Sequence, residues 1–196
     1  MARYPAIAAT SDAILGLLQT ASIGSEFAGI SLAHYQAKNL EKPMNQGISL
    51  VLYRVNVSAN RNLPPRRGLD GKRYRTPLPL DLHYLVIAWA DDTIKQQRLL
   101  GWAIRTIEDS PVLPAGVLNQ HGPEPDVFRP SETVELVWEN LTQQDTTNIW
   151  DAAKAKEQPS AAYVARYVEI ESEIPLVDAE LVQTRELDYA EAGAPA

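Results

Sequence analysis

The chain has 196 residues, of which 45% are hydrophobic and 22% charged, and its formal net charge is −7. This length and balance fit one globular domain with a single core. The chain contains no cysteine, which excludes disulfides and thiolate chemistry. No apolar run approaches the ~20 residues that cross a bilayer, and the first residues form a poor signal-peptide core. We therefore expect no membrane span.

The charges are distributed unevenly along the chain. Residues 169–196 carry eight acidic residues and one basic residue, so this segment accounts for the whole imbalance. Its first acidic side chains are Glu169, Glu171, Glu173, Asp178 and Glu180. Opposite charge gathers in a stretch that contains Arg61, Arg66, Arg67, Lys72, Arg73 and Arg75. A neutral body with a basic loop and an acidic tail favours contacts between oppositely charged surfaces.

The first third of the chain predicts a helix followed by two strands. Pro5 suits an early helical position, and apolar residues follow it at helical spacing, which predicts an amphipathic helix over 5–20. Strands are expected over 28–37 and 48–57. In the second of these, one alternating set forms the cleaner apolar face: Val51, Tyr53, Val55 and Val57.

The middle of the chain combines a long connection with the strongest strand. Residues 58–79 contain many Pro and Gly residues, and a long connection of this kind is typical of a functional or disordered segment. The strand expected over 80–90 becomes more apolar as it proceeds, so it enters the core. The pair Asp91-Asp92 suits the start of a helix over 93–108. This order of elements indicates an α/β or α+β fold.

The last third predicts a helical turn over 114–119, a strand over 132–140, a helix over 143–155 and a strand over 162–173. After Pro175 the chain is acidic with scattered apolar residues, which is typical of an arm that orders against a partner. We divide the chain into a domain over 1–172 and an acidic C-terminal arm over 173–196.

The sequence offers few groups for catalysis or metal binding. Its histidines, His34, His83 and His121, are far apart, whereas metal sites need ligands at close spacing. No nucleophile elbow and no phosphate-binding glycine loop is present. We expect His83 to be a hydrogen-bonded strand residue, and we predict no catalytic residue, no metal and no cofactor.

One alternative is a small ligand-binding or hydrolytic α/β domain. Asp81 and His83 share one face of the predicted strand, and Asp91 and Asp92 could act as a carboxylate pair. The pair of acids is better explained as a helix cap, and no third member of a catalytic triad accompanies Asp81 and His83.

The basic stretch 61–75 has three possible explanations. It could bind nucleic acid through its charge, it could be a solvated loop, or it could contact an acidic arm of another subunit. The chain as a whole is acidic, and Tyr74 is the only aromatic residue of the stretch, so no series of stacking residues supports nucleic-acid binding. We therefore expect no nucleic-acid partner.

Several segments together resemble a known family. They are ISLVLYRVNVSANRNLPPRR (48–67), TPLPLDLHYLVIAWADD (76–92), QQRLLGWAIRTIEDSPVL (96–113) and QPSAAYVARYVEIES (158–172). Their pattern is similar to the amino-terminal domain of the cap, or tail and sheath terminator, proteins of extracellular contractile injection systems, of the antifeeding-prophage and Photorhabdus virulence cassette type. The resemblance covers residues 5–172, and the acidic arm has no counterpart in it.

This resemblance implies a fold and an assembly role. The fold would be like that of phage tail terminators: a small mixed, largely antiparallel sheet flanked by helices, here with an extended loop and a C-terminal arm. The protein would form a homohexameric ring that ends the inner tube and contacts the last sheath ring. The resemblance brings no catalytic residues, and it implies assembly in the bacterial cytoplasm and, for a released particle, an extracellular location.

Overall fold

The structure is a computed structural model, and it describes residues 4–59, 61, 63–68, 70–122 and 124–176. Its helices and strands follow one another in this order: α1 (Ala6–Ser22), β1 (Ser31–Tyr35), the 3₁₀ helix η1 (Ala37–Glu41), β2 (Gly47–Val57), β3 (Leu78–Trp89), α2 (Thr93–Glu108), β4 (Val112–Pro114), α3 (Ala115–Leu118), β5 (Thr133–Trp138), α4 (Gln143–Ala152) and β6 (Ser160–Ile170). Among these residues, no helix is long and apolar enough to cross a membrane.

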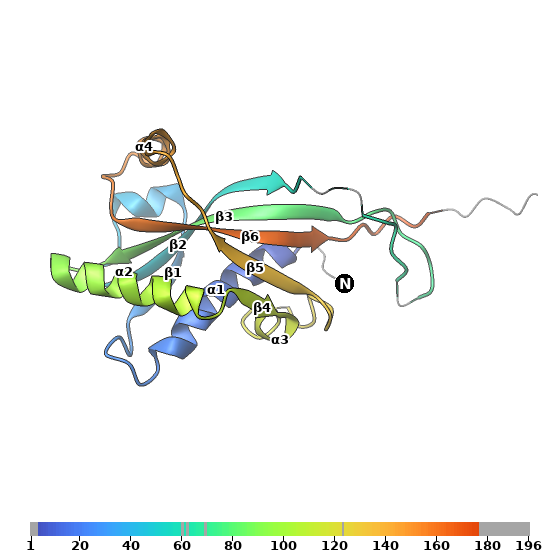
Figure 1. The fold of residues 1–196 in the computed structure, drawn as a ribbon, viewed down its shortest axis with the longest axis horizontal. Coiled ribbons are helices and arrows are strands. Elements are labelled where there is room, and N and C mark those ends of the chain that lie inside the picture. The colour runs from blue at the N-terminus through green and yellow to red at the C-terminus, as the bar shows by residue number, and fades with distance from the viewer. Residues whose placement is uncertain (1–3, 60, 62, 69, 123, 177–196) are drawn as a thin grey trace, which may run out of the picture.

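A six-stranded sheet in the order β1-β2-β3-β6-β5-β4 forms the centre of the molecule (Figure 1). Only β1 and β2 run parallel, and the other neighbours are antiparallel. This arrangement confirms the expected mixed, largely antiparallel sheet with flanking helices. The helices and strands predicted from the sequence are all present, and η1 and β4 are the two elements that were not predicted.

Helices α1 and α2 cover one face of the sheet (Figure 1). Helix α2 begins as predicted, because the Asp92 carboxylate accepts a hydrogen bond of 2.7 Å from the Lys95 backbone N–H. A helical stripe of Leu99, Ala103 and Ile107 is buried against the sheet. Together with α1 and α3, this packing forms the larger core.

Helices η1 and α4 cover part of the opposite face. The apolar side chains of this smaller core come from β2, β3, η1, α4 and β6, and they include Val51, Leu85, Ile87 and Trp150. Trp89 closes this face, and its indole N–H donates a buried 2.8 Å hydrogen bond to the Ser49 hydroxyl. The second half of β3 is therefore buried on both faces, which confirms that this strand enters the core as it proceeds.

The apolar face expected along β2 is buried only in the first half of the strand, where Val51 and Tyr53 pack in the smaller core. Val55 and Val57 are 45% and 43% exposed, whereas Ile48 and Leu50, from the other alternating set, are buried. The register between β2 and β3 shifts between Leu52 and Arg54. Val55 and Val57 therefore lie opposite Leu82 and Leu80, on the face of the larger core, but they remain exposed there. Alternation along the sequence alone cannot reveal this change, because it assumes an unbroken strand.

Candidate assembly surfaces

The long connection between β2 and β3 contains a small hairpin. The Gly68 N–H donates to the Lys72 carbonyl and the Tyr74 N–H to the Arg66 carbonyl, both at 2.9 Å. Gly71 has φ = +77°, a left-handed conformation that glycine adopts without strain. The hairpin gives residues 66–68 and 70–74 a defined conformation in a stretch where the sequence predicted no regular structure.

The segment after β6 lies beside this hairpin. The Arg75 N–H donates to the Ile174 carbonyl at 3.1 Å, and the Leu176 N–H donates to the Arg73 carbonyl at 2.7 Å. Figure 1 shows both segments extending together beyond one end of the sheet. We call residues 61–75 and 171–176 together the projection.

Arg66 joins the projection to the body of the molecule. Its guanidinium lies 2.6 Å from Glu169, 3.3 Å from Glu132 and 3.7 Å from Glu171, while Arg129 lies 2.5 Å from Glu171. These carboxylates are largely buried, since their side chains are 14%, 14% and 7% exposed for Glu132, Glu169 and Glu171. Burial raises the pKa of Glu169, and the nearby Arg66 opposes that rise. Part of the basic stretch thus pairs with part of the acidic segment inside one chain.

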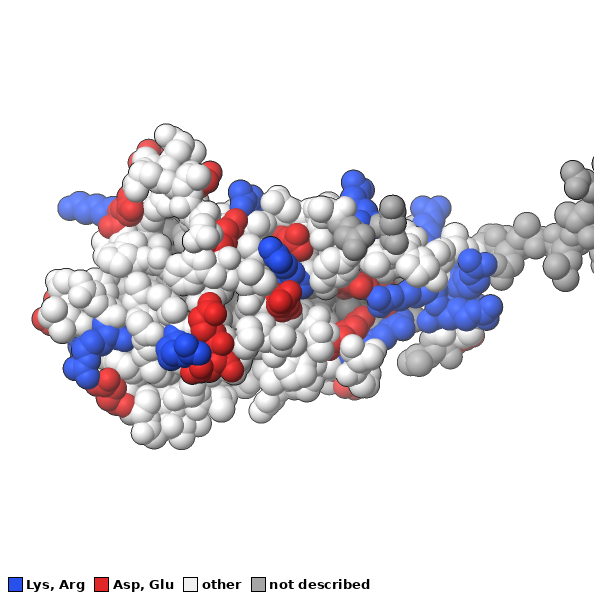
Figure 2. Space-filling model, viewed as in Figure 1, with Lys and Arg blue, Asp and Glu red and all other residues white. Residues whose placement is uncertain are grey.

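The other cations of the basic stretch are exposed on the projection: Arg61, Arg67, Lys72, Arg73 and Arg75. Figure 2 shows Lys and Arg side chains gathered at this end of the molecule. Glu173 is also exposed there, whereas Asp178 and Glu180 lie outside the described residues. The projection therefore presents a mainly cationic outer surface.

The residues of the alternative catalytic set are not brought together. The Asp81 carboxylate accepts a hydrogen bond from the Tyr167 backbone N–H at 3.3 Å, and Asp92 caps α2 at the other end of β3. A strand rises about 3.3 Å per residue, so His83 and Asp91 are separated by about 26 Å. Within the described residues no group of His, Cys, Asp and Glu is arranged to hold a metal ion.

His83 instead belongs to a polar cluster that the sequence did not predict. Its Nδ1 lies 2.9 Å from Glu139 and 3.1 Å from the Arg54 guanidinium, and its Nε2 lies 3.1 Å from the Asn56 side-chain amide. The Tyr53 hydroxyl donates to Glu139 at 2.5 Å, and burial together with this bond raises the pKa of Tyr53. Arg54 completes the cluster with a 2.7 Å ion pair to Glu139. These bonds confirm the expected hydrogen-bonded strand histidine and tie β5 to β2 and β3.

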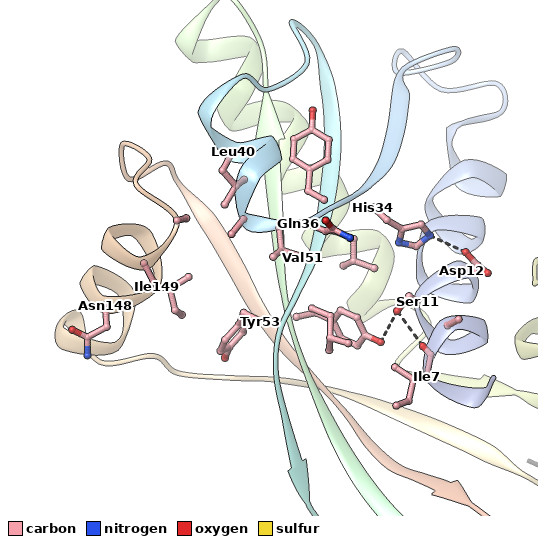
Figure 3. Close-up of a pocket in the computed structure, with 18 of the residues that line it drawn as sticks. Ile7, Ser11, Asp12, His34, Gln36, Leu40, Val51, Tyr53, Asn148 and Ile149 are labelled. Atoms are coloured by element: carbon pink, nitrogen blue, oxygen red, sulfur yellow. Dashed lines mark hydrogen bonds and ion pairs between the residues drawn. The ribbon is translucent and has the colours of Figure 1, made fainter. Parts of the chain in front are cut away.

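A groove of about 800 Å³ runs beside β2, at the point where β1 ends (Figure 3). Ile7 and Ser11 of α1 line one wall, and Leu40 of η1 and Ile149 of α4 line the other. The Ser11 hydroxyl lies 2.8 Å from the Tyr84 hydroxyl within the groove. This groove was not predicted from the sequence, because its walls come from segments that are distant along the chain.

Comparison with known protein families decides what kind of domain this is. A family model described as the Pvc16 N-terminal domain matches residues 9–184. The chain belongs to this family. The resemblance to the amino-terminal domain of injection-system caps is thereby confirmed. A search of curated proteins found no significant match.

Two solved structures resemble the Pvc16 N-terminal domain described here. One is the sheath/tube terminator, in the extended state, of PVC, an extracellular contractile injection system. Its TM-score is 0.60 at 11% identity, over 97% of this chain and 65% of that chain. The other is the tube-terminating cap of the anti-feeding prophage, with a TM-score of 0.42 at 14% identity over 81% and 54% of the two chains. The chain thus spans less than two thirds of either protein, and the first match shows a shared terminator-like fold.

Proposed function

We propose that this chain is a structural cap that terminates a contractile, phage-tail-like injection particle. The observation that carries the proposal is its membership of the Pvc16 N-terminal domain family over residues 9–184, supported by a fold shared with a sheath/tube terminator. In this role the chain binds the end of the inner tube, contacts the last sheath ring and prevents further rings from adding. It assembles in the bacterial cytoplasm and stays with the particle on release.

The cap acts as a homohexameric ring. A closed ring requires a head-to-tail interface, in which one surface of a subunit meets a different surface of the next. The projection supports such an interface, since it extends beyond the sheet and is held by Arg66 to the body of its own chain.

The exposed cations of the projection bind acidic surfaces of the tube, the sheath or the neighbouring subunit. Arg61, Arg67, Lys72, Arg73 and Arg75 are exposed on the projection and placed for this contact. Arg66 is less exposed and pairs with Glu169 and Glu171 within the chain. Charge complementarity of this kind sets partner choice and orientation more than affinity.

A charge-reversal experiment tests this role. Arg61, Arg67 and Arg75 are each replaced by Glu in a particle expressed with all its components, and particle ends and lengths are measured by electron microscopy. We expect uncapped ends and a broad length distribution, because the reversed charges repel an acidic partner. The matched control replaces three exposed lysines away from the projection, Lys42, Lys154 and Lys156, by Glu.

Two outcomes would contradict the proposal at different levels. Normal ends and lengths in the arginine variant would remove the projection from the interface. Particles of unchanged structure after deletion of the whole protein would remove the capping role itself.

A further inference from the structure

The outer edge of β2 is open over half of its length. Strand β1 pairs only with Gly47–Val51, and among the described residues no strand pairs with the outer edge of Leu52–Val57. Residues 54–57 are exposed, including the apolar side chains of Val55 and Val57. An open edge with exposed valines is a surface that readily pairs with another strand.

The groove borders the first part of this open edge, because Leu52 and Tyr53 are among its lining residues. It lies where β1 would continue, with α1 on one side of the sheet plane and η1 and α4 on the other (Figure 3). Because side chains of a strand alternate between two faces, one set would point toward α1 and the next toward α4. Beside Leu52 and Tyr53, Ile7 offers an apolar contact on the first side, and Leu40 and Ile149 offer apolar contacts on the second.

We propose that this edge of β2 binds residues 177–187 of a neighbouring copy of the same chain as an added β-strand. This inference rests on the proposed function, in which the chain forms a ring, and it identifies one contact between neighbouring subunits of that ring. Backbone hydrogen bonds to Leu52–Val57 supply affinity, and the alternating side chains supply register.

The sequence of the segment fits the two faces of the edge. Val177, Ala179 and Leu181 alternate with Asp178 and Glu180. Val55 and Val57 lie opposite Leu82 and Leu80 of the larger core. If the apolar side chains of the added strand point toward α1, they would cover these two valines.

The acidic set would then face the opposite side of the sheet. Arg54 lies on that side, paired with Glu139, and its side chain is 43% exposed. A cation at this edge favours acidic residues on the part of the incoming strand that lies beyond the groove, next to Arg54.

The direction of the chain favours a neighbour as the recipient. The last described residues, Ile174 and Leu176, are hydrogen-bonded to the hairpin, which leads the chain away from its own β2 edge (Figure 1). Pairing with six residues needs about 20 Å of extended chain, and residues 177–187 supply more than this length.

The absence of cysteine makes a cross-linking test direct. Full-length chain carrying Val55→Cys is mixed with full-length chain carrying Ala179→Cys and treated with a short bis-maleimide. Such a reagent tolerates a register shift of about two residues, since a strand rises ~3.3 Å per residue. The control mixture replaces Val55→Cys by Val112→Cys, a 50% exposed valine on the edge strand at the other side of the sheet. We expect several-fold more covalent dimer in the first mixture.

Each other result would overturn the inference. Equal yields in the two mixtures would exclude strand exchange at this edge. A chain carrying both Val55→Cys and Ala179→Cys that cross-links only within itself would assign the groove to its own arm. Cross-linking of Val55→Cys to a tube or sheath subunit in assembled particles would name a different occupant.

Electron microscopy of the unmodified chain separates this inference from the proposed function. If the unmodified chain forms rings but the two cross-linking mixtures give equal yields, strand addition alone is contradicted. A chain that neither forms rings nor caps particles would contradict the proposed function.

Discussion

The two ends of the sheet are stabilised in different ways. At the end that contains Trp89, the second half of β3 is buried between α1 and α2 on one face and η1 and α4 on the other. At the end that contains Leu78, apolar side chains remain exposed and the chain extends into the projection. The closed end needs no partner for its stability, whereas the open end leaves surface for one.

Charge pairs hold the open end in place of apolar packing. Arg66 binds three carboxylates there, and Arg129 binds one of them. Partly buried ion pairs fix geometry more than they add stability, because much of their attraction offsets the loss of hydration. The ion pairs therefore give the open end a defined conformation while adding little to the free energy of unfolding. This combination suits a surface that binds other subunits.

The largest expected effect is a loss of stability at the closed end. Val51→Ala removes buried apolar groups from β2 and leaves a cavity, and we expect it to lower the free energy of unfolding by about 2 kcal/mol. Val51 is 6% exposed, whereas Val55 on the same strand is 45% exposed. The same change at Val55 should cost under about 1 kcal/mol. Urea denaturation measures both, and equal losses would contradict the distinction between the two ends.

A smaller effect is expected from breaking the charge cluster of the open end. Arg66→Ala leaves Glu132, Glu169 and Glu171 close together without their shared cation, and we expect a loss of about 1–2 kcal/mol, reduced by the 31% exposure of the arginine side chain. Salt should narrow the difference from the unmodified chain, because it screens the repulsion among the carboxylates. Arg67→Ala, at an exposed arginine in the same hairpin, is the control. A loss that is unaffected by salt would assign the effect to packing.

The sequence predicted the helices and strands better than it predicted which side chains are exposed or paired. The strand over 80–90 and the helix over 93–108 were predicted because their apolar patterns and the Asp92 cap are local signals. The change of face within β2 was missed because a register shift between Leu52 and Arg54 interrupts its alternation. The pairing of Arg66 with Glu169, and of His83 with Glu139, joins residues that are far apart in the chain, and only the tertiary fold brings them together.

The smallest expected effect is a change in the pH dependence of stability at the open end. Burial raises the pKa of Glu169 above its ordinary value of 4.5, so the folded state holds this proton more tightly than the unfolded state. The stability from this group is fully present below about pH 4.5 and is lost as pH rises through the raised value.

Glu169→Gln keeps the side chain neutral at every pH, so the variant should gain stability relative to the unmodified chain as pH rises from 4.5 toward neutrality. Urea denaturation across that range measures the difference, and Glu135→Gln, at an exposed acid of β5, is the matched control. A difference that shrinks with rising pH would mean that Arg66 outweighs burial at this carboxylate. The ion pairs would then make a net contribution to the stability of the open end. Both ends of the sheet would be stable without a partner, and they would differ only in whether apolar packing or ion pairs stabilise them.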